Sequence, residues 1–243
     1  MRVAITGAAG RVGKEIADDL RPDHELTLID CQPIKGVRSI TADVSAPMAP
    51  SEPNSLASVL RDAEVLVHLA EDPNPHAPWQ RVLSNNIGGT WNVTRLAAES
   101  GVRRIVYASS HWAVRALEEE LAPTYRMPDG RKIHENVPPR PNTYYGIAKI
   151  CGELTGKMLV ESGALQSFVA VRIGNFEPQA NPDPHRRTFG IMSGDLRRLF
   201  RRCVEADFSG FHIVYGVSKQ DCGPFDLHHA NALLGWEPTE LPS

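Results

Sequence analysis

This sequence has few cysteines, a small net charge and no long apolar run, and each of these features argues against a class of protein. The 4 cysteines stand far apart and form no CxxC pair, which argues against a disulfide framework or a zinc site and agrees with a reducing cytoplasm. A formal net charge of -3 offers no basic surface to nucleic acid or to an anionic membrane. The chain opens directly on an apolar strand pattern and has no run of roughly 18 apolar residues, so we expect neither a signal peptide nor a membrane span. These features predict a cytoplasmic protein without a metal site.

What is present is an alternation of short apolar runs and longer amphipathic ones along 243 residues. Val, Ile and Leu dominate the short runs, which we interpret as strands at 2–6, 25–29, 37–42, 64–69, 104–108, 167–173 and 211–215. Helical spacing is found at 11–20, 79–100, 143–162 and 195–206, with a short helix before Leu234. Such strands, separated by helices, are typical of a parallel sheet covered on both faces. We therefore predict an α/β fold with a Rossmann-like, doubly wound parallel sheet.

A glycine-rich turn with GxxGxxG spacing follows the first expected strand and opens the first expected helix. Gly7 permits a tight turn, Gly10 lets the backbone approach a pyrophosphate, and Gly13 allows helix and strand to pack closely. The phosphates would face the unpaired amides at the helix N-terminus. The position of the turn, between a strand and a helix at the start of the chain, favours a dinucleotide site over a purely structural turn.

Two acidic residues at the ends of the next strands narrow the choice of dinucleotide. Asp30 can accept hydrogen bonds from the ribose hydroxyls of an adenosine and would repel the 2′-phosphate of NADP. Arg11 or Lys35 could attract that phosphate, but the balance favours NAD. Asp43 follows the third strand, where it could contact the adenine edge; a role as a cap or turn residue is equally open.

The chain divides into two expected parts where the pattern loosens. Residues 1–174 would form the NAD-binding Rossmann domain, and residues 175–243 a small substrate-covering lobe that is not independent. A Pro-rich stretch at 117–141 is expected to be a loop insertion, because loops of that length are usually functional or mobile.

Tyr145 and Lys149 are spaced i,i+4 at the start of an expected helix, so both side chains lie on one face. A tyrosine is a poor base near neutral pH unless a nearby cation favours its phenolate, and Lys149 can supply that cation. Ser110 ends the fifth strand, where a hydroxyl could hold a substrate oxygen. Tyr144 would lie on a different helical face from Lys149, and His68, inside an apolar strand, is expected to be a core or near-cofactor residue rather than a base.

Several short motifs occur together in this chain: GAAGRVG, Asp30, VHLA, NNIGGT, ASS, YGIAK and LGWEP. In this combination the chain resembles the extended short-chain dehydrogenase/reductases, the NAD-dependent epimerase/dehydratase family. It is most similar to the uronate dehydrogenase group and its NAD-dependent glucose-6-phosphate dehydrogenase relatives. The resemblance covers nearly the whole chain.

The resemblance implies that Tyr145 is the general base, Lys149 its electrostatic partner and Ser110 the ligand of the substrate oxygen. It also implies a row of residues along NAD: Gly7, Gly10, Arg11, Val12, Gly13, Asp30, Asp43, Val44, Leu69, Ala70, Asn86, Tyr145, Lys149 and Ile173.

The substrate side is expected to involve Asn74, Ser110, His111, Trp112, Asn175 and Arg186. In the dehydrogenase group the second serine is followed by Asn-His, which hold the sugar. This chain has His111 and Trp112 there, and an indole differs from an imidazole in both volume and hydrogen bonding. The identity of the sugar therefore does not carry over.

The leading interpretation is an NAD-dependent oxidoreductase that oxidises a hydroxyl of a sugar, sugar acid or sugar phosphate. A nucleotide-sugar epimerase or dehydratase with permanently bound NAD is the alternative enzyme; it usually needs a larger C-terminal part. A catalytically silent NAD-binding sensor is the third possibility. The resemblance also implies a homodimer through the helices at 79–100 and 143–162.

Overall fold

Seven strands form one parallel sheet in the computed structural model, and two short strands form a separate small sheet. The structure describes residues 1–35, 37, 39–46, 56–125, 130–176, 178, 183, 188–219 and 223–241. The strand order is β3-β2-β1-β4-β5-β6-β9, and every pairing is parallel. The strands are β1 (Arg2–Thr6), β2 (Glu25–Asp30), β3 (Ser39–Thr41), β4 (Val65–His68), β5 (Arg104–Ser110), β6 (Ser167–Ile173) and β9 (Gly210–Gly216). The predicted doubly wound parallel sheet is confirmed.

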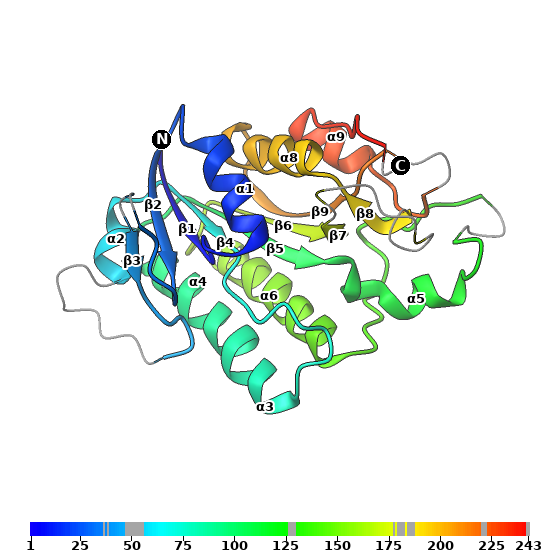
Figure 1. Cartoon of the computed structure of the whole chain (residues 1–243), viewed down its shortest axis with the longest axis horizontal. Helices are drawn as coiled ribbons and strands as arrows, with labels where there is room; N and C mark the ends of the chain where they lie inside the picture. The colour runs from blue at the N-terminus through cyan, green and yellow to red at the C-terminus, as the bar shows by residue number, and fades with distance from the viewer. Residues whose placement is uncertain are drawn as a thin grey trace.

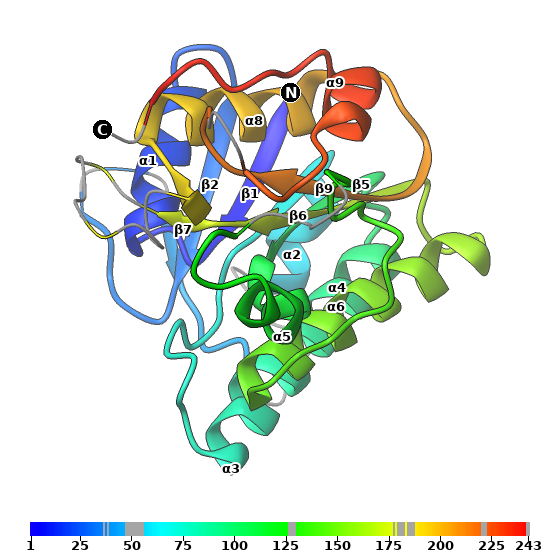
Figure 2. The ribbon, with the colours of Figure 1, turned by 90° about the vertical axis from the view of Figure 1, so that its right-hand side faces the viewer.

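Helices cover both faces of this sheet (Figures 1 and 2). One face carries α1 (Arg11–Leu20) and α8 (Ser193–Glu205), and the other carries α2 (Leu56–Asp62), α4 (Gly89–Glu99) and α6 (Tyr144–Glu161). Successive strand side chains point to opposite faces, so Val3 and Ile5 pack with the first set while Ala4 packs with the second. Because both faces are buried, the strands read as continuous apolar runs.

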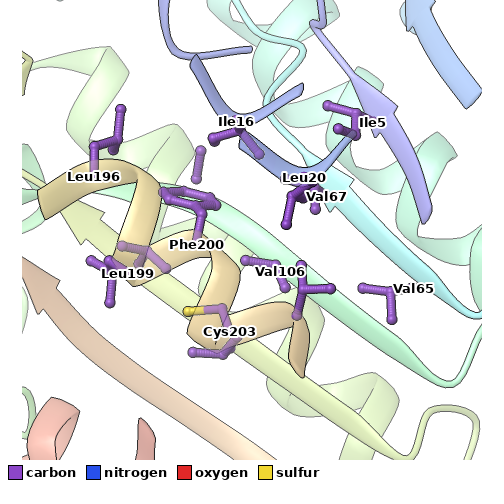
Figure 3. Close-up of a cluster of buried hydrophobic side chains, with 14 of the residues drawn as sticks. Ile5, Ile16, Leu20, Val65, Val67, Val106, Leu196, Leu199, Phe200 and Cys203 are labelled. Carbon is purple, nitrogen blue, oxygen red and sulfur yellow. The ribbon is translucent and has the colours of Figure 1, made fainter. Parts of the chain in front are cut away.

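The core under α1 and α8 is a dense cluster of mostly aliphatic side chains, with the phenyl ring of Phe200 among them (Figure 3). Ile5, Val67 and Val106 rise from three neighbouring strands toward the two helices. Ile16 of α1 and Phe200 of α8 meet them from the helical layer and are almost fully buried. This packing holds the start of α1 firmly against the end of β1, where the glycine-rich turn lies.

The helix expected at 79–100 is three consecutive helical segments. It begins as α3 (Trp79–Arg81), widens into a π-helix, η1 (Val82–Gly88), and continues as α4. Val44 lies so close to the junction that a Cβ added at Gly89 would be 3.1 Å from its Cγ2 atom. A π-helical turn often occurs at a functional site, because it turns one side chain out of the regular helical path. Here the segment contains Asn86.

The chain after Gly174 does not stand apart from the sheet. β9 pairs with β6 along its whole length, and α8 belongs to the core cluster beneath α1. The remaining described elements of this part are β7 (Asn175–Phe176), β8 (Gly190–Ile191) and α9 (His228–Leu234). The boundary expected at Gly174 therefore cuts through one continuous sheet and its helical cover.

Residues 117–120, expected to begin a loop insertion, are helical. They belong to α5 (Arg115–Glu120), which follows a 3-10 turn, η2 (His111–Val114), directly after β5. Further along, Ile133 bridges to Phe225, so the stretch returns to the C-terminal part of the chain. Among the helices of the described residues, none combines the length and apolarity needed to span a membrane.

Candidate active site

The predicted functional side chains gather at the carboxyl edge of the sheet, where the central strands end. Thr6, which precedes Gly7, is paired in register with His68, and Ser110 is paired with Ile173. In open parallel sheets, ligands bind outside these carboxyl ends, where the chain winds in opposite directions from neighbouring strands. Here β1 and β4 are those neighbours.

The glycine-rich turn has the backbone shape that its sequence predicts. Gly7 has a φ of 71°, and its carbonyl accepts a hydrogen bond of 3.1 Å from the amide of Gly10. A Cβ added at Gly7 would lie 2.8 Å from the backbone nitrogen of Ala70, and one at Gly13 would lie 2.3 Å from the carbonyl oxygen of Gly7. Side chains at both positions are therefore excluded by backbone atoms that cannot move aside.

The start of α1 is open to an anion. Gly10 is the N-cap residue and has no side chain to bond the first amides, and the first turn of α1 has no acidic residue. Arg11 is exposed and its guanidinium lies 5.2 Å from the ring centre of Phe176, donating a 3.0 Å hydrogen bond to the Phe176 carbonyl. Val12 packs on the core beneath the turn. This glycine cradle fits the pyrophosphate of a dinucleotide.

The Asp30 carboxylate is held next to the turn. Its Oδ2 atom accepts a 2.9 Å hydrogen bond from the amide of Ala9, and Oδ1 accepts one of 2.9 Å from the amide of Gln32. Asp30 is only 9% exposed, so the backbone fixes the direction of its side chain. The Cys31 thiol also donates to Oδ1 at 3.6 Å, whereas Oδ2 keeps a second lone pair, which can accept a ribose hydroxyl.

Asp43 forms a turn with its own neighbour. Its Oδ1 atom accepts bonds from the Ser45 amide at 2.9 Å and the Ser45 hydroxyl at 2.7 Å, and the hydroxyl bond is the main reason that the pKa of Asp43 is lowered. Asp43 therefore acts as a turn residue, which is one of the two roles that the sequence left open. Its contact with adenine stays a prediction. Val44 beside it is buried against Gly89.

Ser110, Tyr145 and Lys149 come together from β5 and α6. Thr143 caps α6 by accepting a 3.1 Å hydrogen bond from the amide of Gly146, which sets where the helix begins. The Nζ atom of Lys149 lies 5.1 Å from the ring centre of Tyr145. Burial raises the pKa of Tyr145 above its usual value, while the charge of Lys149 and a hydrogen bond from Ser110 lower it. Ser110 and Lys149 therefore both act on Tyr145, and the catalytic roles of the three residues stay predictions.

Two residues that were not expected to be catalytic, Tyr144 and His68, do not point their side chains at the Tyr145–Lys149 pair. Tyr144 is 50% exposed and packs against Trp79 rather than Lys149. His68 is buried between Thr6 and Thr90, and burial lowers its pKa to about 3. A histidine held neutral in this way is a core residue near the site.

The residues expected on the substrate side are only partly brought together. Trp112 is half-buried, with its ring centre 6.4 Å from that of Tyr145 in an edge-on arrangement. The Nδ2 atom of Asn175 is buried, and it has no hydrogen-bond partner among the residues that the structure describes. Such a donor is free to bond a ligand.

The other substrate-side predictions fit less well. His111 is almost completely buried, and its Nδ1 atom lies 2.9 Å from Glu118 Oε1 while its ring stacks on Phe189. Asn74 is exposed, and its Oδ1 atom accepts a bond from the amide of His76 within a local turn. Arg186 lies outside the described residues.

The model of the family described as "NAD dependent epimerase/dehydratase family" matches residues 3–200. The chain belongs to this family. It is 32% identical over 249 residues to the NAD-dependent glucose-6-phosphate dehydrogenase of Haloferax volcanii, covering 98% of this chain and 93% of that protein. The L-arabinose 1-dehydrogenase (NAD(P)(+)) of the same organism is 28% identical over 252 residues, with coverages of 98% and 96%.

Solved structures of the family agree with this relation. A uronate dehydrogenase variant from Agrobacterium tumefaciens in complex with NAD has a TM-score of 0.79 and 27% identity to this chain, covering 98% of it and 84% of the solved chain. The predicted resemblance to the epimerase/dehydratase family and to its uronate dehydrogenase group is confirmed.

One buried residue of this family member escaped prediction. Glu71 follows the VHLA motif, and its side chain is 4% exposed. Its Oε2 atom lies 2.7 Å from the Nζ atom of Lys149. The Nδ2 atom of Asn86, in the π-helix, donates to the same oxygen at 3.2 Å and to the Asp72 carbonyl at 3.0 Å. The available signal was a carboxylate three residues after a buried strand, where a buried charge needs a partner.

Proposed function

We propose that this chain is an NAD-dependent oxidoreductase that oxidises a hydroxyl of a sugar, sugar acid or sugar phosphate. One observation carries the proposal: the Ser110, Tyr145 and Lys149 side chains lie at the same sheet edge as the glycine cradle and Asp30. A sensor would need only the cradle. NAD, when bound, supplies the ring carbon that accepts a hydride.

Each catalytic side chain has a distinct task in this proposal. Ser110 holds the substrate oxygen, and the Tyr145 oxygen takes the proton from the hydroxyl that is oxidised. Lys149 places a positive charge beside Tyr145 and so favours the phenolate. Proton and hydride leave the same C–OH unit, so base and cofactor must converge on that unit.

The substrate class is proposed from the relatives and from the local side chains. The relatives named above are dehydrogenases of a sugar phosphate, an aldose and a uronate. Trp112 beside Tyr145 supplies an apolar wall, and Asn175 supplies a buried donor for a sugar hydroxyl. We propose that residues 175–243 cover the substrate with this donor and neighbouring groups.

We also propose that the protein works in the cytoplasm as a homodimer. Cys31, Cys151 and Cys203 are unpaired thiols, which suits a reducing compartment. Large apolar side chains are exposed along η1, α4 and α6, among them Leu83, Trp91, Ile147, Leu154 and Met158. A second copy of the chain could bury them.

The test is a panel of uronic acids, aldoses and sugar phosphates, supplied with NAD or NADP and followed by the absorbance of the reduced cofactor. We expect NADH to accumulate with at least one of them. Conversion of a UDP-sugar without any accumulation of NADH would instead establish the epimerase alternative.

The matched variant is Tyr145→Phe, which removes only the hydroxyl. Loss of a general base should lower turnover by about 1,000-fold. Binding of NAD, followed by quenching of protein fluorescence, should persist. Unchanged turnover in this variant would remove Tyr145 from the mechanism, and a wild-type chain that binds NAD without turning over any compound would be the sensor.

A further inference from the structure

Glu71 lies at the centre of a buried set of hydrogen-bond donors. Oε1 accepts from the Tyr107 hydroxyl at 2.7 Å and from the Thr90 hydroxyl at 3.1 Å. Oε2 accepts from Asn86 at 3.2 Å and faces the Lys149 ammonium at 2.7 Å. These donors come from β5, α4, η1 and α6, so four separate elements converge on one carboxylate.

Lys149 is fixed as firmly as its partner. Its side chain is 5% exposed, and Nζ donates to the Ala108 carbonyl at 2.5 Å as well as meeting Glu71. Burial by itself would lower the pKa of Lys149, but the charges and hydrogen bonds of Glu71 and Tyr145 together outweigh burial, and the pKa is raised. Glu71 therefore sets where the ammonium lies and, together with Tyr145, favours its charged form.

The same carboxylate opposes what Lys149 does to Tyr145. Burial raises the pKa of Tyr145, Lys149 lowers it, and Glu71 raises it again. The other titratable groups around the set add little positive charge: His68 on β4 is neutral, and Tyr107 on β5 has its pKa raised well above the usual value.

The next charged pair along α6 is already balanced. Glu153 on α6 is bonded by Arg172 on β6, with both contacts at 2.9 Å. Lys149 and Glu71 are therefore the pair of opposite charges that acts most directly on Tyr145.

We propose that Glu71 is a positioning residue, a buried counter-ion that fixes the ammonium of Lys149 and sets the pH range in which Tyr145 can accept a proton. The proposal deepens the proposed oxidoreductase function and rests on it. Replacing the carboxylate by a neutral group should leave the Lys149 charge unopposed, so that the Tyr145 phenolate forms at lower pH.

Glu71→Gln is the direct test, because glutamine keeps the shape of the side chain. Its amide oxygen can face Lys149 and Asn86, while its NH2 group can donate to the hydroxyls of Tyr107 and Thr90, which also accept hydrogen bonds. The acid limb of the pH profile of kcat/KM should move down by about one pH unit. We also expect kcat to fall several-fold, since a neutral amide oxygen holds Lys149 less firmly than the carboxylate does.

A second readout does not depend on turnover. The ultraviolet absorbance of the Tyr145 phenolate is the difference between a chain with Tyr145 and its Tyr145→Phe counterpart. In the Glu71→Gln background this absorbance should rise at lower pH than in the wild type. If the protein oxidises no sugar, the proposed function fails while this titration still reports on Glu71.

Two further variants separate charge from structure. Glu71→Asp keeps the charge but shortens the reach, so the acid limb should stay near its wild-type position while kcat falls. Glu161→Gln removes a carboxylate at the exposed end of α6 and should change neither readout.

Should Glu71→Gln fail to fold, the nearly isosteric and uncharged Glu71→Met carries the same prediction. A pH profile and a phenolate titration that both stay in place when Glu71 is neutral would overturn the proposal.

Discussion

Single residues at the sheet edge are held by backbone contacts before any ligand binds, and Asp30 shows this best. Its two oxygens accept bonds from the amides of Ala9 and Gln32, so the carboxylate cannot turn away from the glycine cradle. A charged acceptor in a fixed direction gives strong hydrogen bonds to a ribose, worth about 1.5–3 kcal/mol each.

Asp30→Ala should therefore weaken NAD binding by roughly 10- to 100-fold. The discrimination against NADP should shrink as well, because the repulsion of its 2′-phosphate disappears. Titration calorimetry with each cofactor measures both effects. Asp18→Ala, on an exposed position of α1, is the control for loss of a carboxylate. Equal affinity of Asp30→Ala and the control for NAD would show that the ribose lies elsewhere.

Residues in short contiguous motifs were accessible from the sequence, and residues defined by packing were not. The glycine turn, Ser110 and the Tyr145–Lys149 pair depend on spacing within one strand end or one helix turn. The contacts of Glu71 come from four elements that meet only in the folded chain. His111 was expected in the substrate pocket for its place in the sequence, whereas its Nδ1 atom is turned toward Glu118 of the following helix.

Among the elements, those with strong periodicity were predicted well. α1 and β6 have the bounds that were expected, 11–20 and 167–173. The π-helix was missed because regular helical spacing continues through it. β9 was recognised as a strand near 211–215, but local periodicity cannot say which strand it joins.

The link between α6 and the sheet is a buried ion pair. Arg172 on β6 is 1% exposed, and its guanidinium bonds Glu153 on α6 through both of that residue's oxygens. Ser109 on β5 also donates to Glu153 at 2.6 Å, and Tyr215 on β9 accepts from Arg172 at 3.1 Å. One pair thus connects three strands to the helix that carries Tyr145.

Arg172→Met should cost about 3–5 kcal/mol of the free energy of unfolding, because it leaves the Glu153 carboxylate buried and unpaired. Adding Glu153→Leu should recover much of that loss, since a buried pair replaced by apolar groups is often nearly neutral. Urea unfolding of both variants measures this. Lys157→Met, which breaks an exposed pair on the same helix, should cost no more than about 1 kcal/mol. A double variant as unstable as the single one would contradict the ion-pair explanation.

On the scale of the whole molecule, the two helical layers have different outer surfaces. Ion pairs connect α1 to α8, including Arg197 with Glu15 and Arg201 with Asp19. The outer side of α4 and α6 instead exposes Trp91 at 43% and Leu154 at 61%. The two helical layers lie on opposite faces of the sheet (Figure 2), and the exposed apolar side chains are on the layer through which we propose that the homodimer forms.

Leu154→Glu should convert the proposed homodimer into a monomer. Fully burying a leucine is worth about 2 kcal/mol, and a carboxylate in its place would also have to be desolvated opposite its copy. Sedimentation velocity of the wild type should show a dimer, and the variant should sediment as a folded monomer with an unchanged circular dichroism spectrum. Leu241→Glu alters an exposed leucine, 57% accessible, outside these helices and should remain dimeric. A wild-type chain that is monomeric at all concentrations would contradict the proposed homodimer. A Leu154→Glu chain that stays dimeric would place the interface elsewhere. In either case the apolar face of α4 and α6 would need another partner.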